Sequence, residues 1–420
     1  MDGESISSMQ FERMPWGLTF IIGLGFFTTG ITWSLYNSYV PIFLRNIIES
    51  DPYWYALLAL WINTFIGIVM ILDNIAAITL QPWIGAKSDN TWTRFGRRMP
   101  YLMVGIPIAA LFFAFIPVVK DLILLLLIIM VFNIAMALYR APVVALMPDI
   151  IPSKFRSKAN GVINFMGGVG AVYAFFVGSY IYEYFGAFWT FAVTSIIMIT
   201  ALIILMLYIK EPEKPLDVEE RISIIKAFNE VLSDEDKSAL FMLLAIMFWF
   251  FAYNIIETWF TTYGVLILNV TEYEASRALT GFALVFILFA IPAGFIATKI
   301  GRRKTIIYGL IGLTALLFII GFLRSLLLIA VLLAVAGICW AMININSIVI
   351  VWEIGGYRKL GAYTGLYYFF SSIAAIFGPL IAGTIFDLVG FEIMFFLSVG
   401  FLIVALICML GVKKGEVHVS

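Results

Sequence analysis

Twelve long apolar runs constrain this chain more than any other feature. Each is close to the ~20 apolar residues that a helix needs to cross the hydrocarbon of a bilayer. Only 12% of the 420 residues are charged, about half the ~25% of a soluble domain. The sequence therefore predicts an all-α membrane protein with twelve transmembrane helices that contacts a lipid bilayer and no nucleic acid. The runs lie near 16–43, 57–84, 99–118, 122–147, 160–182, 187–209, 239–265, 276–298, 305–323, 326–350, 361–386 and 391–411.

The distribution of Lys and Arg predicts the orientation of these spans. With the N-terminus inside, the segments expected in the cytoplasm hold 21 of them and the outside loops hold 4, while Arg140 alone falls within a span. Basic residues gather on the cytoplasmic side of membrane proteins. We therefore predict that both termini are cytoplasmic and that Lys87, Lys154 and Lys214 face the cytoplasm.

An internal repeat divides the chain into two halves. Gly-Arg-Arg occurs at 96–98 and again at 301–303, each time between the second and third span of its half. Asp149 precedes Glu353 by 204 residues, and Gly161 precedes Gly365 by the same number. Parallel repeats of this kind are typical of transporters whose substrate site lies between the repeats. We predict an N-terminal six-helix half at 1–209, a cytoplasmic linker at 210–237 and a C-terminal six-helix half at 238–420.

Two segments resemble the major facilitator superfamily. The loop GAKSDNTWTRFGRR at 85–98 is similar to that family's loop between its second and third helices. Its sequence most resembles that of the sucrose/proton symporters and the glycoside–cation symporters. The segment RAPVVALMPD at 140–149, followed by RSKAN at 156–160, resembles the fourth-helix region of the same branch. The resemblance implies a monomeric transporter in the plasma membrane that moves a small molecule, a sugar, by alternating access.

Two departures from related groups bear on the coupling ion. The tail GVKKGEVHVS lacks the Pro-Glu-Thr-Lys-Gly motif of sugar porters. Sodium-coupled melibiose-type carriers have two aspartates four residues apart in the second helix, whereas Asp73 has Val69 and Ala77 at those positions. A sodium cage is therefore disfavoured, and H⁺ is the expected coupling ion.

Two charged residues in predicted spans are candidates for the coupling mechanism. Asp73 lies 12 residues before Gly85, about 18 Å along a helix that rises 1.5 Å per residue. Arg140 lies nine residues before Asp149, at similar depth. A charge in a span costs several kcal/mol and points to a function, although a permanent structural ion pair is the alternative. We predict that Asp73 carries the proton and that Arg140 pairs with it and regulates it.

Further polar and aromatic residues form stripes on the predicted helices. Glu257 has Asn254 on the same helix face and is the reserve candidate for the proton site. Aromatic rings beside amides suit sugars, which have apolar ring faces and hydroxyl edges. The resemblance also implies that Arg140 contacts the sugar. The predicted substrate-binding residues are Arg140, Asn37, Trp33, Asn133, Asn254, Trp340 and Asn344.

The two Gly-Arg-Arg loops contain candidates for a gate at the cytoplasmic side. Positive charges there satisfy the orientation rule in any case. An aspartate within the first basic loop indicates an added role, namely ion pairs that hold the inner gate shut and break when it opens. The predicted gate residues are Asp89, Arg97, Arg98, Asp149, Arg302 and Arg303.

The sequence disfavours an enzyme. The single histidine, His418, lies in the tail, and no Gly-x-Ser-x-Gly or Walker motif is present. Cys339 and Cys408 both lie in apolar runs, where they are expected to pack rather than bind a metal. No cofactor or metal is therefore expected. The alternatives within transport are a proton antiporter for drugs or other small molecules and a sodium-coupled sugar symporter.

Overall fold

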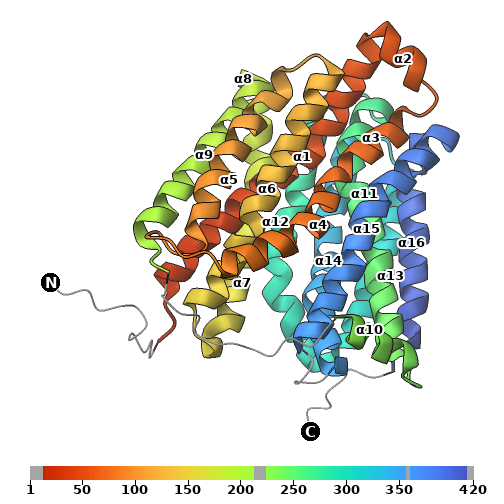
Figure 1. Cartoon of the computed structure of the whole chain (residues 1–420). Helices are drawn as coiled ribbons and strands as arrows, with labels where there is room; N and C mark the ends of the chain where they lie inside the picture. The colour runs from red at the N-terminus through yellow and green to blue at the C-terminus, as the bar shows by residue number, and fades with distance from the viewer. Residues whose placement is uncertain (1–12, 212–223, 356–359, 414–420) are drawn as a thin grey trace. The chain divides into compact units, whose positions relative to one another are not determined.

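The computed structural model describes residues 13–211, 224–355 and 360–413. Sixteen α-helices lie within these ranges (Figure 1). A chain of such apolar residues forms helices because a bilayer has no water to bond free backbone groups. The helices are α1 (Trp16–Ser50), α2 (Pro52–Leu58), α3 (Ile62–Met70), α4 (Leu72–Asp89), α5 (Met99–Phe115), α6 (Leu122–Ile150), α7 (Ser153–Tyr173), α8 (Ser179–Phe185), α9 (Ala187–Tyr208), α10 (Ile224–Ser233), α11 (Ser238–Ile267), α12 (Glu272–Ile300), α13 (Arg302–Ile320), α14 (Leu326–Gly355), α15 (Leu360–Val389) and α16 (Met394–Gly411).

Twelve spans in the described ranges are long and apolar enough to cross a membrane. Each of the twelve predicted runs corresponds to one of them, with ends that differ by a few residues. The first span, for example, is a single helix over Trp16–Ser50 rather than 16–43. The all-α, twelve-span prediction is confirmed. The orientation of the spans stays a prediction, and Lys214 lies outside the described residues.

The first compact unit comprises Met1–Pro52 and Leu72–Glu219. In it α1 packs against α7 and α9, while α5 packs against α6 and α9, and α4 lies along α6. A π-helical turn at Ala174–Gly178 joins α7 to α8. α1 and α6 are therefore held in one unit, and their side chains can form a common site.

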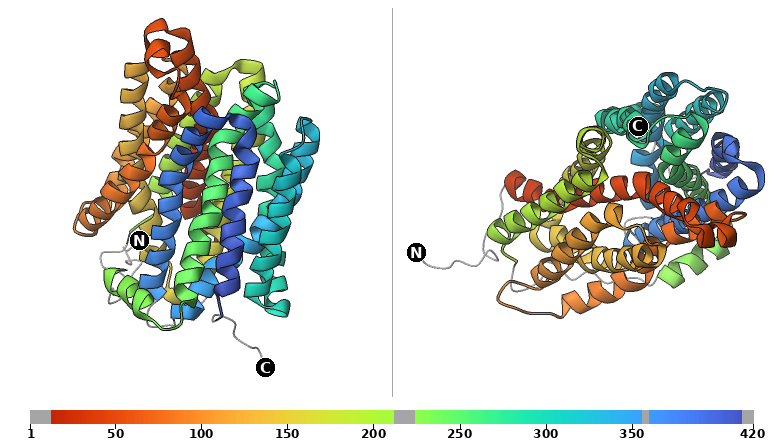
Figure 2. Two further views of the ribbon diagram at one scale, coloured as in Figure 1. Left: turned by 90° about the vertical axis from the view of Figure 1, so that its right-hand side faces the viewer. Right: turned by 90° about the horizontal axis from the view of Figure 1, so that it is seen from above.

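The second compact unit comprises Tyr53–Ile71 and Glu220–Ser420. In it α12 packs on α14, α11 on α15 and α16, and α13 on α14 and α16. Figure 2 shows the short α10 beside the lower end of α15, which it contacts. The same unit contains α3, which packs on α15. The predicted halves and linker stay a prediction. The observed units place 53–71 with the C-terminal part of the chain.

The second span is broken where the compact units change. α3 ends at Met70 and α4 begins at Leu72, and the Ile71 N–H bonds back to the Gly67 carbonyl at 3.2 Å. Asp73 stands in the first turn of α4. The span as a whole still runs continuously over Ile62–Asp89. The predicted proton carrier thus lies two residues after a local irregularity in mid-span.

Candidate functional site

An aromatic cluster in the first unit surrounds the predicted substrate residues of α1 and α6. The Trp33 ring contacts Tyr36 and Phe132 edge-on, with centroids 5.5 and 6.0 Å apart. Tyr36 stacks on Phe132 at 5.6 Å. The Arg140 guanidinium lies 5.9 Å from the centroid of Trp33, within the range of cation–π attraction. Trp33 and Arg140 are thus brought together as predicted.

Several polar atoms in this cluster lack a protein partner. Asn133 is only 3% exposed. In the part of the chain that the structure describes, neither of its amide atoms is hydrogen-bonded, and the same holds for Trp33 Nε1 and the Tyr36 hydroxyl. The Tyr36 hydroxyl lies near the amide of Asn133 and interacts electrostatically with Asp73. The cluster therefore combines aromatic faces, a cation, a carboxylate and unused hydrogen-bonding groups.

Asp73 and Arg140 belong to the same unit. Asp73 accepts a hydrogen bond from Asn74 Nδ2 at 2.8 Å. Both charged side chains are half-buried, as is the predicted substrate residue Asn37, which follows Tyr36 on α1. Pairing of Asp73 with Arg140 stays a prediction. Tyr36 shares a helix face with Trp33 and Asn37 in the sequence, but neither it nor Phe132 was among the predicted substrate-binding residues.

A second set of predicted residues is brought together in the second unit. Tyr253 stacks on Trp340 with centroids 4.7 Å apart and planes at 9°. Its hydroxyl donates to Glu257 Oε1 at 3.3 Å. The Asn254 amide donates to its own helix, at the Phe250 carbonyl. Tyr253 was not predicted, although it stands one helical turn before Glu257. Asn344 is half-buried on the same helix as Trp340.

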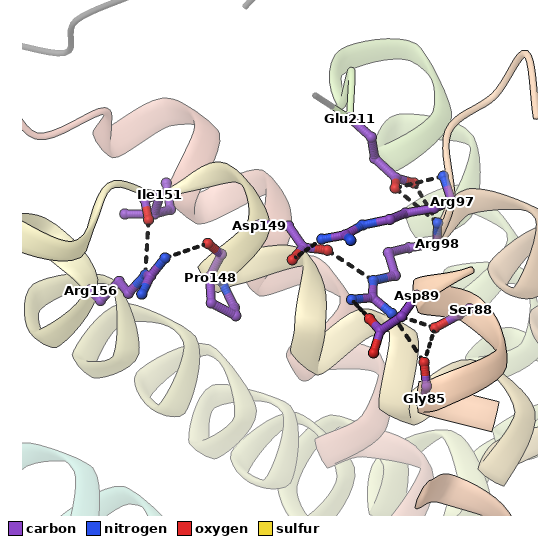
Figure 3. A network of polar contacts seen from close by, with 10 residues as sticks. All are labelled: Gly85, Ser88, Asp89, Arg97, Arg98, Pro148, Asp149, Ile151, Arg156 and Glu211. Carbon is purple, nitrogen blue, oxygen red and sulfur yellow. Dashed lines mark hydrogen bonds and ion pairs between the residues drawn. The ribbon is translucent and has the colours of Figure 1, made fainter. Parts of the chain in front are cut away.

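The first predicted gate loop forms a buried ion-pair network within the first unit (Figure 3). Asp149 binds Arg97 at 2.5 Å and Arg98 Nε at 2.8 Å. Arg98 also pairs with Asp89 and donates to Ser88. Burial acts to lower the pKa of Arg98, but Asp149 and Asp89 outweigh it, so the pKa is raised. The predicted set Asp89, Arg97, Arg98 and Asp149 does come together, and its gating role stays a prediction.

Glu211 completes this network and was not predicted. It follows α9 and accepts hydrogen bonds from the backbone N–H groups of Arg97, Arg98 and Met99 at 2.7–2.9 Å. Those groups lie at the start of α5, where backbone N–H groups lack helical partners. Gly96 makes the approach possible: its φ is +104°, and an added Cβ would lie 2.6 Å from Glu211 Cδ. The spacing of residues within the loop gave no signal for this distant carboxylate.

The second Gly-Arg-Arg loop repeats part of this arrangement in the second unit. Gly301 has φ +93° before α13, and Arg302 pairs with Glu353. The Gly-Arg-Arg repeat relates Arg97 to Arg302 at an offset of 205, and Asp149 corresponds to Glu353 at an offset of 204, so the Arg302–Glu353 pair matches the Arg97–Asp149 pair. Arg303 instead donates to the Leu410 carbonyl at 3.0 Å. The repeat signal thus extends to the ion pair, and Glu353 is the partner that the predicted gate set lacked.

Comparison with known proteins identifies the family. The model of the Major Facilitator Superfamily matches residues 22–276 and 265–419. This chain belongs to the Major Facilitator Superfamily. It is therefore a membrane transporter of small molecules that works by secondary transport, and not an enzyme. Within the described residues no group of three His, Cys, Asp or Glu could hold a metal ion. The sucrose and glycoside branch stays a prediction for this superfamily member.

Individual members of known function share little sequence with this chain. The cis,cis-muconate transport protein of Acinetobacter baylyi is 27% identical over 188 residues, which cover 43% of this chain and 45% of that protein. The nucleoside transporter NupG has a TM-score of 0.72 at 13% identity, over 94% of this chain and 100% of that one. A bacterial homologue of the human lysosomal transporter Spinster, inward-facing and occupied, has a TM-score of 0.74 at 15% identity, over 95% and 97%. At these identities the structures show the fold alone.

Proposed function

We propose that this chain is a proton-coupled symporter of a sugar, a disaccharide or glycoside, that acts as a monomer in the plasma membrane. In this proposal Trp33, Asn133 and Arg140 bind the sugar, with Asn37 beside them. Asp73 carries the proton, and Glu257 is the reserve proton site. Asn254, Trp340 and Asn344, which belong to the second unit, stay predicted substrate-binding residues.

The observation that carries the proposal is the set of buried polar atoms, at Trp33, Tyr36 and Asn133, that have no hydrogen-bond partner among the residues that the structure describes. A buried hydrogen-bonding group left unsatisfied costs about 1–3 kcal/mol. In this cluster several such atoms lie beside aromatic rings and the Arg140 guanidinium. A polyhydroxylated ligand would provide both donors and acceptors, and its apolar ring face would fit the rings of Trp33 and Tyr36.

The proposed coupling follows from the charges of Asp73 and Arg140. Without sugar, the guanidinium stabilises the ionised carboxylate. When sugar hydroxyls engage Arg140, Asp73 loses that counter-charge, and a proton takes its place. Sugar binding and proton binding then favour each other to the same extent, as linkage requires. A bare charge is costly to move through a closed apolar site, so the form that crosses is the one loaded with both sugar and proton.

Uptake by the purified protein in liposomes tests the proposal. An imposed inward proton gradient should drive accumulation of labelled sucrose, maltose or a glucoside, and a sodium gradient should not. Asp73→Asn should abolish uphill accumulation but keep sugar exchange, whereas Arg140→Ala should lose both. Accumulation that survives Asp73→Asn but not Glu257→Gln would move the proton site to Glu257. Drug efflux driven by the proton gradient would support the antiporter alternative instead.

One observation favours a second candidate, an organic carboxylate as substrate. Among the described residues Arg140 has no ion-pair partner, and a guanidinium binds a carboxylate through two parallel hydrogen bonds. The relative from Acinetobacter baylyi is named as a transporter of such a dicarboxylate. Thermal stabilisation of the purified protein by a panel of sugars and by cis,cis-muconate separates the two candidates. Stabilisation by muconate alone would replace the sugar proposal.

A further inference from the structure

A single carboxylate on α15 binds the start of α3. Asp387 Oδ1 accepts from the backbone N–H of Asn63 at 3.0 Å and from its side-chain amide at 2.8 Å. Oδ2 accepts from the backbone N–H and the hydroxyl of Thr64, both at 2.7 Å. Four donors thus converge on one side chain, and two of them are backbone groups that a helix start leaves without helical partners.

Close backbone packing surrounds this contact. A Cβ added to Gly383 would lie 2.3 Å from the Asn63 carbonyl oxygen, and one added to Gly67 would lie 2.9 Å from the Pro379 carbonyl oxygen. Thr64 and Thr384 approach through their hydroxyls at 3.3 Å. Small residues let helices in a membrane approach closely. α3 and α15 are therefore joined by both shape and hydrogen bonds.

The position of α3 along the chain makes this contact relevant to transport. α3 begins the second span, which belongs to the first sequence repeat, whereas α15 is the eleventh span and belongs to the second repeat. The span crosses to the other compact unit just after Ile71. Asp387 therefore holds one end of a first-repeat helix against the second repeat. The charge distribution assigns this end, next to the loop before α3, to the outside.

We propose that Asp387 is a latch that keeps the predicted outer end closed, and that the transporter opens there only after Asn63 and Thr64 leave the carboxylate. A charge-assisted set of four hydrogen bonds favours the closed form strongly, and water replaces it when α3 moves away. The proposal rests on secondary transport by this family and not on the identity of the substrate. Its failure and that of the sugar proposal are therefore separate results.

Alkylation of a cysteine placed in the contact tests the latch. Thr384→Cys is made in a background with Cys339→Ala and Cys408→Ala, and the purified full-length protein is treated with a hydrophilic maleimide without substrate. Asp387→Asn should raise the alkylation rate about tenfold, since hydrogen bonds to a charged group contribute on the order of that factor or more. The matched control is Asp121→Asn, because Asp121 also caps a helix start, at Leu124, but only within α6. The control should leave the rate unchanged.

A pair of milder variants covers the case in which Asp387→Asn does not fold. Thr64→Val removes one hydroxyl donor while keeping the side-chain shape, and Thr64→Ser keeps the hydroxyl. Alkylation should be about threefold faster in the valine variant and unchanged in the serine variant, as expected for one lost hydrogen bond. Equal rates in a folded Asp387→Asn protein and its parent, or in the two Thr64 variants, would show that Asp387 does not hold this end closed.

Discussion

Arg98 Nε donates to Asp149 Oδ2 at 2.8 Å, and the two residues are only 4% and 8% exposed. The bond joins the residue before α5 to the last turn of α6. The distribution of basic residues predicts that this end of α6 faces the cytoplasm. A buried pair of this kind is costly to break from one side, because the remaining charge stays in a poorly solvated position. The ion-pair network around it therefore stabilises the first unit, and it is formed by residues that the sequence predicts to be part of a gate.

We expect Asp149→Asn to lower the free energy of unfolding by about 3–5 kcal/mol, because both Arg97 and Arg98 then lose a buried counter-charge. Thermal or denaturant unfolding of the purified protein measures this. Arg94→Gln is the matched control: it removes a charge from the same loop, but Arg94 is exposed and lies over the ring of Phe95. Equal stability of the two variants would contradict a structural role for the buried network.

Gly96→Ala should be strongly destabilising, whereas Gly85→Ala in the same region should not. An alanine at Gly96 has to adopt a φ of +104° and would press its Cβ against Glu211. At Gly85 an added Cβ meets nothing within 4 Å, and helix propensity favours alanine by about 1 kcal/mol. The thermal midpoints should move in opposite directions. A similar loss in both variants would mean that the Glu211 contact is not what requires glycine.

Asp89→Asn tests whether the first loop acts as a gate. The change removes one ion-pair partner of Arg98 and leaves Asp149 in place. If the network holds the cytoplasmic side closed, we expect the inward-open form to gain population, by a few-fold for an ion pair worth about 1 kcal/mol. Alkylation rates of cysteines introduced near the cytoplasmic end measure this shift. Rates that match the parent protein would limit Asp89 to a structural role.

Asn133→Leu should separate function from stability. The Asn133 amide is buried without a hydrogen-bond partner among the described residues, so its replacement by a similar-sized apolar group should keep or raise the thermal midpoint. Substrate binding should be lost. Asn346→Leu is the control, because the Asn346 amide donates to the Met342 carbonyl at 2.9 Å, and it should destabilise the protein. A stable Asn133→Leu protein with full transport would exclude Asn133 from the substrate site.

The orientation of the spans can be checked with two single cysteines. A membrane-impermeant maleimide added outside intact cells should label Lys120→Cys, in a predicted outside loop, and leave Lys87→Cys unlabelled. The physical reason is the excess of basic residues that stays on the cytoplasmic side. Labelling of Lys87→Cys alone would show that the topology is the reverse of the predicted one. The predicted inner gate would then lie outside, and the proposed outer latch would lie at the cytoplasmic side.

The predicted site residues were found unevenly by sequence reasoning. Arg140 and Asp73 stand out because a charge within an apolar run is rare for energetic reasons. Glu353 was accessible through the repeat, since it lies 204 residues after Asp149. Tyr36 and Tyr253 gave a weaker signal, because the chain has 19 tyrosines and most aromatic residues in such helices face lipid or pack. The Tyr253 hydroxyl meets Glu257 on its own helix, whereas the interaction of Tyr36 with Asp73 joins two different helices and so depends on their packing.

The sequence by itself determined that this chain is an all-α protein with twelve spans, because the length and apolarity of each run are local properties that decide its partition into a bilayer. It also determined the repeat and the family. Only the tertiary structure decided which helices are neighbours: that α3 packs with α15, that Asp387 binds Asn63 and Thr64, that Glu211 reaches the start of α5, and that Arg302 rather than Arg303 meets Glu353. Between helices in lipid the hydrophobic effect provides little preference, so partners are selected by close packing and hydrogen bonds between residues far apart in the chain.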